Sequence, residues 1–196
     1  MFGSALKRFA RNSAFSTLLV RAAIVGANFV VMIGLAAWLG LDGFGTLVAL
    51  WSAALVASTV LSLGGPLILL RAATDGGGLR RRDMLDWALI RPAGLGVVVC
   101  LALSVAWPAL PWVAITGAGV CINFLNCLAS IMRGLGSIQL SMALRDAGPQ
   151  VLLGVAGGFA GHAGAATLMG LAAIWMAVWG GFIGFWCLTK TTPLPR

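Results

Sequence analysis

The feature that most constrains this chain is an apolar run from Phe15 to Leu39. A helix rises about 1.5 Å per residue, so about 20 apolar residues cross roughly 30 Å of hydrocarbon, and this run is long enough to cross with some tilt. It carries one charged residue, Arg21, and one carboxamide, Asn28. Because seven residues make almost two helical turns, both side chains fall on one face of the expected helix.

The position of Arg21 within this run is costly. An arginine at the centre of a membrane helix costs about 2.5 kcal/mol or more and seldom faces lipid. Arg21 is therefore expected either to reach the nearer membrane interface or to face a hydrated space within a helix bundle.

The composition places the whole chain in the membrane class. Hydrophobic residues make up 60% of the sequence and charged residues only 9%, whereas a soluble domain has about 25% charged residues. The net charge of +8 comes from basic residues at the ends of apolar runs, without the aromatic-interleaved patches of nucleic-acid-binding proteins. We therefore expect an integral membrane protein with no nucleic-acid partner.

Polar and glycine-rich stretches divide the chain into expected membrane-spanning helices. The first two are joined by a short turn, Gly40–Gly45, and the longest polar connection covers residues 71–86. Pro66 and Pro149 are expected to kink their spans, because proline lacks a backbone N–H. We expect an all-α, polytopic membrane helix bundle in which residues 1–196 form a single six-helix domain, with spans at about 14–39, 46–70, 87–107, 112–132, 138–160 and 165–188.

The distribution of positive charge predicts the orientation of these spans. Lysines and arginines precede the first span, occur in the second and fourth connections and follow the last span, while the other three connections have none. Basic residues favour the cytoplasmic side, so both termini are expected there (N-in/C-in).

Polar side chains within the spans are the candidate functional residues. Arg145 and Asp146 project about 100° apart on an α-helix, so they need not pair with each other. Arg21 and Arg145 have only this one acid nearby, and surplus positive charge facing a cavity would attract an anion such as a diphosphate. For the asparagines, interhelical hydrogen bonding worth about 0.6 kcal/mol each is the alternative role. The candidate cavity-lining residues are Arg21, Asn28, Asn123, Asn126, Arg145 and Asp146.

Several short motifs resemble the amino-terminal part of a polysaccharide-type flippase. They are Ala10–Ser13, the span with Arg21 and Asn28, the turn Leu39–Gly45, and Leu61–Leu67 followed by Arg71. These flippases belong to the multidrug/oligosaccharidyl-lipid/polysaccharide exporter superfamily, which includes the O-antigen flippases and the lipid II flippase. The resemblance covers most of the chain in layout, and in motif it covers the residues up to Arg71.

The resemblance implies a multi-pass protein of the bacterial inner (cytoplasmic) membrane that acts in polysaccharide or lipopolysaccharide biosynthesis. It would move an undecaprenyl-diphosphate-linked oligosaccharide by alternating access, and Arg21 would match a recurring first-span arginine of the family. Members generally have twelve or fourteen spans in two lobes, so a six-span chain is similar to the amino-terminal lobe only. Since one lobe alone cannot alternate, the implied partner is a second copy or a second half-transporter chain.

Other functions remain open from the residues. The chain could be a non-transporting scaffold or assembly subunit, or a truncated, inactive half-transporter. Drug efflux would usually want intramembrane carboxylates, which the first four spans lack. An intramembrane enzyme is not expected, because there is no G-x-S-x-G and no pair of aspartates in adjacent spans, and the single His162 lies in a turn. No CxxC or Cys/His set predicts a metal site, and no cofactor is expected.

Overall fold

The computed structural model describes residues 13–74, 81–160 and 164–190, and 93% of these residues are helical, with no strand among them. The predicted all-α class is confirmed. Residues 75–80 of the polar connection predicted at 71–86, and the predicted turn with His162, lie outside the described residues.

Four helices within the described ranges are long and apolar enough to cross a membrane: Phe15–Ser62, Asp83–Ala106, Trp112–Gly134 and Ala165–Trp186. The first is part of one element, α2 (Ser13–Ser62), which covers the first predicted span and most of the second. The fifth predicted span is divided among three shorter elements. The described fold is therefore all-helical with four candidate membrane-spanning helices, and six crossings stay a prediction.

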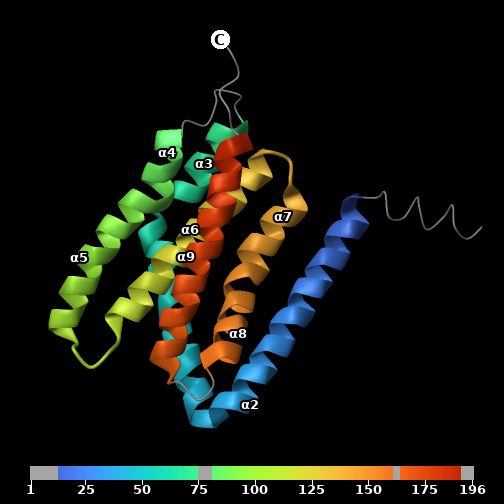
Figure 1. The fold of residues 1–196 in the computed structure, drawn as a ribbon. Helices are drawn as coiled ribbons and strands as arrows, with labels where there is room; N and C mark the ends of the chain where they lie inside the picture. Colours follow the sequence, from blue (N-terminus) through green and yellow to red (C-terminus); the bar gives the residue numbers. More distant parts are fainter. Residues whose placement is uncertain (1–12, 75–80, 161–163, 191–196) are drawn as a thin grey trace, which may run out of the picture.

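The corner within α2 is sharper than the predicted turn Gly40–Gly45. Only Gly40 leaves helical geometry, with φ 69° and ψ 176°, a region essentially restricted to glycine. Residues from Leu41 onward are helical again, and the Thr46 hydroxyl donates to the Asp42 carbonyl at 3.0 Å. The predicted turn was wrong in length, since Gly40 alone interrupts the helical geometry of α2. Figure 1 shows α2 reversing direction at its lower end.

The second half of α2 ends at a break before α3 (Gly65–Thr74). Leu63 and Gly64 both have positive φ, at 44° and 78°, and the Gly64 carbonyl accepts from the amides of Leu67 and Ile68. The sequence predicts a kink at Pro66, and the break falls just before it. This position is expected, because a proline is readily tolerated in the first turn of a helix but not in its interior.

Two further segments are each interrupted by a π-helix. One consists of α4 (Arg81–Leu85), η1 (Asp86–Ile90) and α5 (Arg91–Ala106), and the other of α7 (Ile138–Met142), η2 (Ala143–Ala147) and α8 (Gly148–Ala160). In each segment, the residue before a proline donates its backbone N–H to the carbonyl of the residue five positions earlier. The Arg91 amide donates to the Asp86 carbonyl, and the Gly148 amide donates to the Ala143 carbonyl. The kink predicted at Pro149 takes this form, because a wider turn relieves the clash between a proline ring and the preceding turn.

The helix α6 (Trp112–Gly134) forms the centre of the bundle, with α9 (Ala165–Lys190) in front of it in Figure 1. In α6 72% of the most apolar stretch is buried, against 11% in α2. Small residues allow the close approach, since a Cβ on Gly119 would lie 3.0 Å from the Ala57 Cβ. Both hydrophobic clusters of the core include α6 side chains, among them Ile122 and Leu128.

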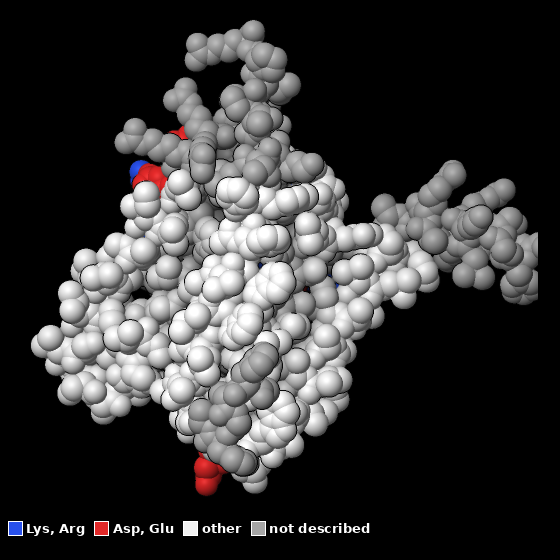
Figure 2. Space-filling model, viewed as in Figure 1, with Lys and Arg blue, Asp and Glu red and all other residues white. Residues whose placement is uncertain are grey.

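Charged groups are concentrated towards the two ends of the bundle in Figure 2, and the surface between them is almost uncharged in that view. In Figure 1 the start of α7 and the ends of α3, α6 and α9 lie together at the upper end. Arg71 and Arg133 are in the last turns of α3 and α6 and are exposed there. We call this end of the bundle the basic end.

Candidate functional site

The first half of α2 packs along the segment formed by α7, η2 and α8, and we call this contact the α2/α8 seam. The Gln139 amide donates to the Ser16 hydroxyl at 2.8 Å, near the start of both helices. Further along, Cβ atoms added to Gly154 and Gly157 would lie 2.8 Å from Val31 and 2.6 Å from Leu35. The two helices are therefore parallel.

The α2/α8 seam sets the relative depth of the two predicted arginines. Ser16 and Gln139 are 123 residues apart in sequence, and Val31 faces Gly154 at the same offset. Because parallel helices advance equally per residue, Arg21 is level with residue 144, next to Arg145. The two cations that the sequence singled out thus lie at one depth on adjoining helices.

One hydrogen bond joins the two helices at the π-helix. The Asn28 Nδ2 donates to the Asp146 backbone carbonyl at 3.1 Å. Pro149 has no N–H, and the widened turn of η2 shifts the remaining backbone bonds, so carbonyl groups in this turn are open to partners outside the helix. Asn28 therefore lies beside the Arg145–Asp146 pair, and it contacts the backbone of Asp146 and not its carboxylate.

Arg145 and Asp146 form an ion pair, with the Arg145 Nε 3.7 Å from the Asp146 Oδ1. The sequence did not require this pair, and the difference arises because a π-helix winds less per residue than an α-helix, so neighbouring side chains diverge less. Both side chains are well exposed, at 58% and 41%. Arg21 is exposed and has no ion pair with any described residue, so the group of two arginines and one aspartate keeps an excess positive charge.

Buried polar atoms without partners lie on both helices of the α2/α8 seam. The Asn28 Oδ1 and the Gln150 Oε1 are buried and have no hydrogen bond to the described residues. The Ser141 hydroxyl in α7 is likewise buried and has no such hydrogen bond. Unpaired acceptors in an apolar surrounding are unfavourable by about 1–3 kcal/mol each. This region therefore favours a polar ligand or water.

The two asparagines of α6 lie apart from the α2/α8 seam. Asn123 is fully buried, with its Oδ1 4.0 Å from the Cys127 sulfur and its Nδ2 without a partner among the described residues. Asn126 is half-buried, and its carbonyl accepts from the Ser130 hydroxyl at 2.9 Å. Since Cys127 lies against Gly65, Asn123 is close to the break between α2 and α3. The six candidate residues thus divide into the group at the α2/α8 seam and the pair on α6.

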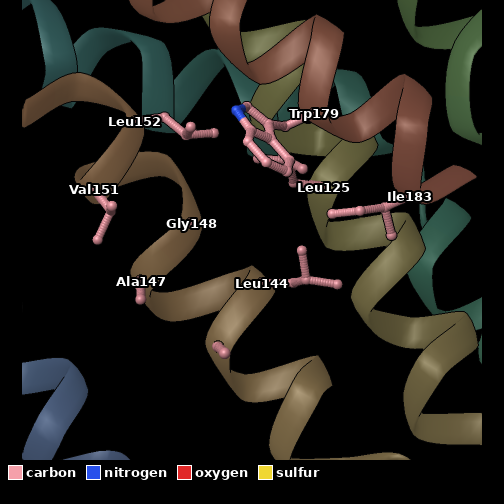
Figure 3. Close-up of a pocket in the computed structure, with 9 residues that line it drawn as sticks. Leu125, Leu144, Ala147, Gly148, Val151, Leu152, Trp179 and Ile183 are labelled. Carbon is pink, nitrogen blue, oxygen red and sulfur yellow. The ribbon is translucent and has the colours of Figure 1, made fainter. Parts of the chain in front are cut away.

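An apolar pocket of about 270 Å³ lies between η2, α8, α6 and α9. Figure 3 shows Leu144, Val151, Trp179 and Ile183 around it. None of the six candidate residues lines this pocket. Their assignment as cavity-lining residues stays a prediction.

Several polar contacts were missed at the level of the sequence. Gln139 and Gln150 were not among the candidate residues, although both lie in the same predicted span as Arg145. At η1 the Arg91 Nε lies 2.7 Å from the Asp86 Oδ2, and its guanidinium lies 4.0 Å from the centre of the Trp87 ring. A proline one residue after an arginine or glycine in an apolar run, as in Arg91–Pro92 and Gly148–Pro149, was the available signal for both π-helices.

The described residues contain no group of three or more His, Cys, Asp or Glu side chains that could hold a metal ion. Comparisons with protein-family models, with curated proteins and with solved structures gave no match to this chain.

Proposed function

We propose that this chain is one lobe of a flippase that moves an undecaprenyl-diphosphate-linked oligosaccharide across the bacterial inner membrane. The single observation that carries the proposal is the common depth of Arg21 and Arg145 on adjoining apolar helices, where one carboxylate, that of Asp146, pairs with Arg145. Guanidinium groups pair well with phosphate oxygens, and cations within apolar spans are costly unless an anion or water accompanies them.

Unpaired acceptors on the same two helices add to this support. The Asn28 Oδ1 and the Gln150 Oε1 could accept hydrogen bonds from sugar hydroxyls or water. The resemblance of the first part of the chain to polysaccharide-type flippases points to the same class of substrate. In this proposal the chain crosses the membrane six times with both termini in the cytoplasm, and a second copy or a second half-transporter supplies the other wall of the pathway.

A scaffold without transport activity is the second candidate. The observation that favours it is that the pocket between α6, α8 and α9 is apolar and lies apart from the six candidate residues. A scaffold needs no anion site, so it predicts that the two arginines can be replaced freely.

The test replaces the two arginines singly, as Arg21→Gln and Arg145→Gln, in cells whose surface glycan depends on this chain. We expect each variant to reach the membrane in normal amounts and to lose surface glycan, while lipid-linked precursor accumulates inside. Arg91→Gln is the matched control, because Arg91 also lies within an apolar segment but is paired with Asp86 at η1. Normal glycan export by both Arg21→Gln and Arg145→Gln would refute the flippase proposal and favour the scaffold.

A further inference from the structure

The apolar pocket beside η2 is shaped for a hydrocarbon chain. Its lining comes from four elements and includes Leu125, Leu144, Gly148, Val151, Trp179 and Ile183. The indole nitrogen of Trp179 is the only side-chain nitrogen or oxygen among the sticks in Figure 3. A volume of about 270 Å³ is just below the roughly 300–1,000 Å³ of pockets for drug-sized molecules. The pocket therefore suits a flexible chain segment better than a sugar or a nucleotide.

The pocket exists because small residues meet a widened helical turn. Ala143 and Ala147 lie in η2, and Gly148 follows it directly. A Cβ added at Gly148 would lie 3.9 Å from the Leu125 Cδ1 and 3.8 Å from the Ala143 carbonyl oxygen, so this position has ordinary room for a side chain. The opening is half-exposed between α8 and α9, with Val151 and Trp179 at the surface.

The pocket lies at the membrane depth expected for the part of a lipid chain that is nearest to its headgroup. Leu125 precedes Arg133 by eight residues on α6, or about 12 Å. Headgroups occupy several ångströms on each side of the roughly 30 Å hydrocarbon core, so a chain in the pocket would place its phosphate near the basic end. Arg133 projects within about 80° of the Leu125 direction on the same helix, and it is exposed.

We propose that this pocket holds one hydrocarbon chain of an anionic phospholipid whose phosphate is bound by Arg133. Basic residues at membrane-helix ends attract anionic headgroups. A second copy of the chain packed in parallel at this opening would bring its own Arg133 against that of the first copy, and the like charges oppose that contact at this site. Arg145 lies two residues from both Ala143 and Ala147 and so projects away from the pocket. The lipid site is therefore separate from the α2/α8 seam and does not depend on the transport proposal.

The experiment measures lipid binding to the delipidated full chain by native mass spectrometry, with phosphatidylglycerol and phosphatidylcholine as the two probes. For the natural sequence we expect one tightly held phosphatidylglycerol per chain and weaker phosphatidylcholine. Gly148→Leu fills the pocket and should abolish that binding, while Ala102→Leu, on the exposed face of α5, should retain it. Arg133→Gln should weaken phosphatidylglycerol about fivefold and leave phosphatidylcholine unchanged.

A second variant keeps the test decisive if Gly148→Leu does not fold. Val151→Trp fills the pocket from its rim, where the side chain is already partly exposed, and the same loss of phosphatidylglycerol is expected. Retained binding in Val151→Trp would overturn the proposal, as would equal affinity for the two lipids. A dimer in the lipid-free natural chain that Val151→Trp dissociates would instead identify a second copy as the occupant and would also overturn it.

Discussion

The contact between Gly154 and Val31 allows a quantitative test of the α2/α8 seam. In Gly154→Ala the new Cβ would lie 2.8 Å and 3.1 Å from the two Val31 methyl carbons, where carbon atoms prefer roughly 3.5–4.0 Å. A valine in a helix has one strongly preferred rotamer, so its methyl groups cannot turn away and the two helices must separate. Overpacking of this kind costs about 1–3 kcal/mol.

The rescue follows from the same distances. Val31→Ala removes both methyl groups, and the remaining Val31 Cβ is 3.5 Å from the added atom, which is an ordinary contact. The double variant should therefore be about as stable as Val31→Ala alone, with a coupling of about 1–2 kcal/mol between the two sites. The free energy of unfolding is measured by detergent titration in mixed micelles.

Gly26→Ala is the matched control on the other side of α2, since a Cβ there meets no atom within 4 Å. It should leave stability unchanged or raise it by up to about 1 kcal/mol, because alanine favours the helix. If Gly154→Ala behaves like Gly26→Ala, or if Val31→Ala fails to rescue it, the packing of α2 on α8 described here is refuted.

Three further outcomes are expected from the same unfolding measurement. Asn28→Leu should destabilise by about 1–3 kcal/mol, because the Asp146 carbonyl loses its donor; an unchanged stability would contradict that bond. Gly40→Ala should cost about 1–3 kcal/mol from backbone strain alone, since a Cβ there meets no neighbour within 4 Å; a neutral result would mean that the corner adopts another geometry. Arg91→Gln should change stability by less than about 1 kcal/mol, because its ion pair with Asp86 is half-exposed; a larger loss would show that the π-helix depends on the pair.

For two of the six predicted spans the sequence was a good guide to where the helix begins and ends, because proline and glycine bound their apolar runs. The predicted 112–132 and 165–188 correspond to Trp112–Gly134 and Ala165–Lys190. The corner at Gly40 was misjudged, because polar and small residues such as Asp42 and Gly43 suggest a loop although they remain helical. The π-helices were not predicted. A backbone N–H donates to the carbonyl five residues earlier only when the proline and the neighbouring helix together leave that carbonyl as the available acceptor.

The candidate site could be predicted only in part. Helical spacing placed Arg21 and Asn28 on one face, but it does not reveal which helix that face meets. The shared depth with Arg145 comes from the packing of Val31 and Leu35 on two glycines. Asn123 and Asn126 were both predicted to line a cavity, whereas Asn123 is fully buried in the core.

The central position of α6 has a consequence for how the chain is assembled. Its most apolar stretch has the lowest mean hydropathy of the four long helices, 1.6 against 2.1 in α2, and is also the one most surrounded by protein. Neighbouring helices therefore surround its asparagines in place of lipid. During synthesis this helix leaves the ribosome when α2 and α5 are already available but α9 is not, so we expect it to remain near the insertion machinery until the carboxyl-terminal helices arrive to enclose it.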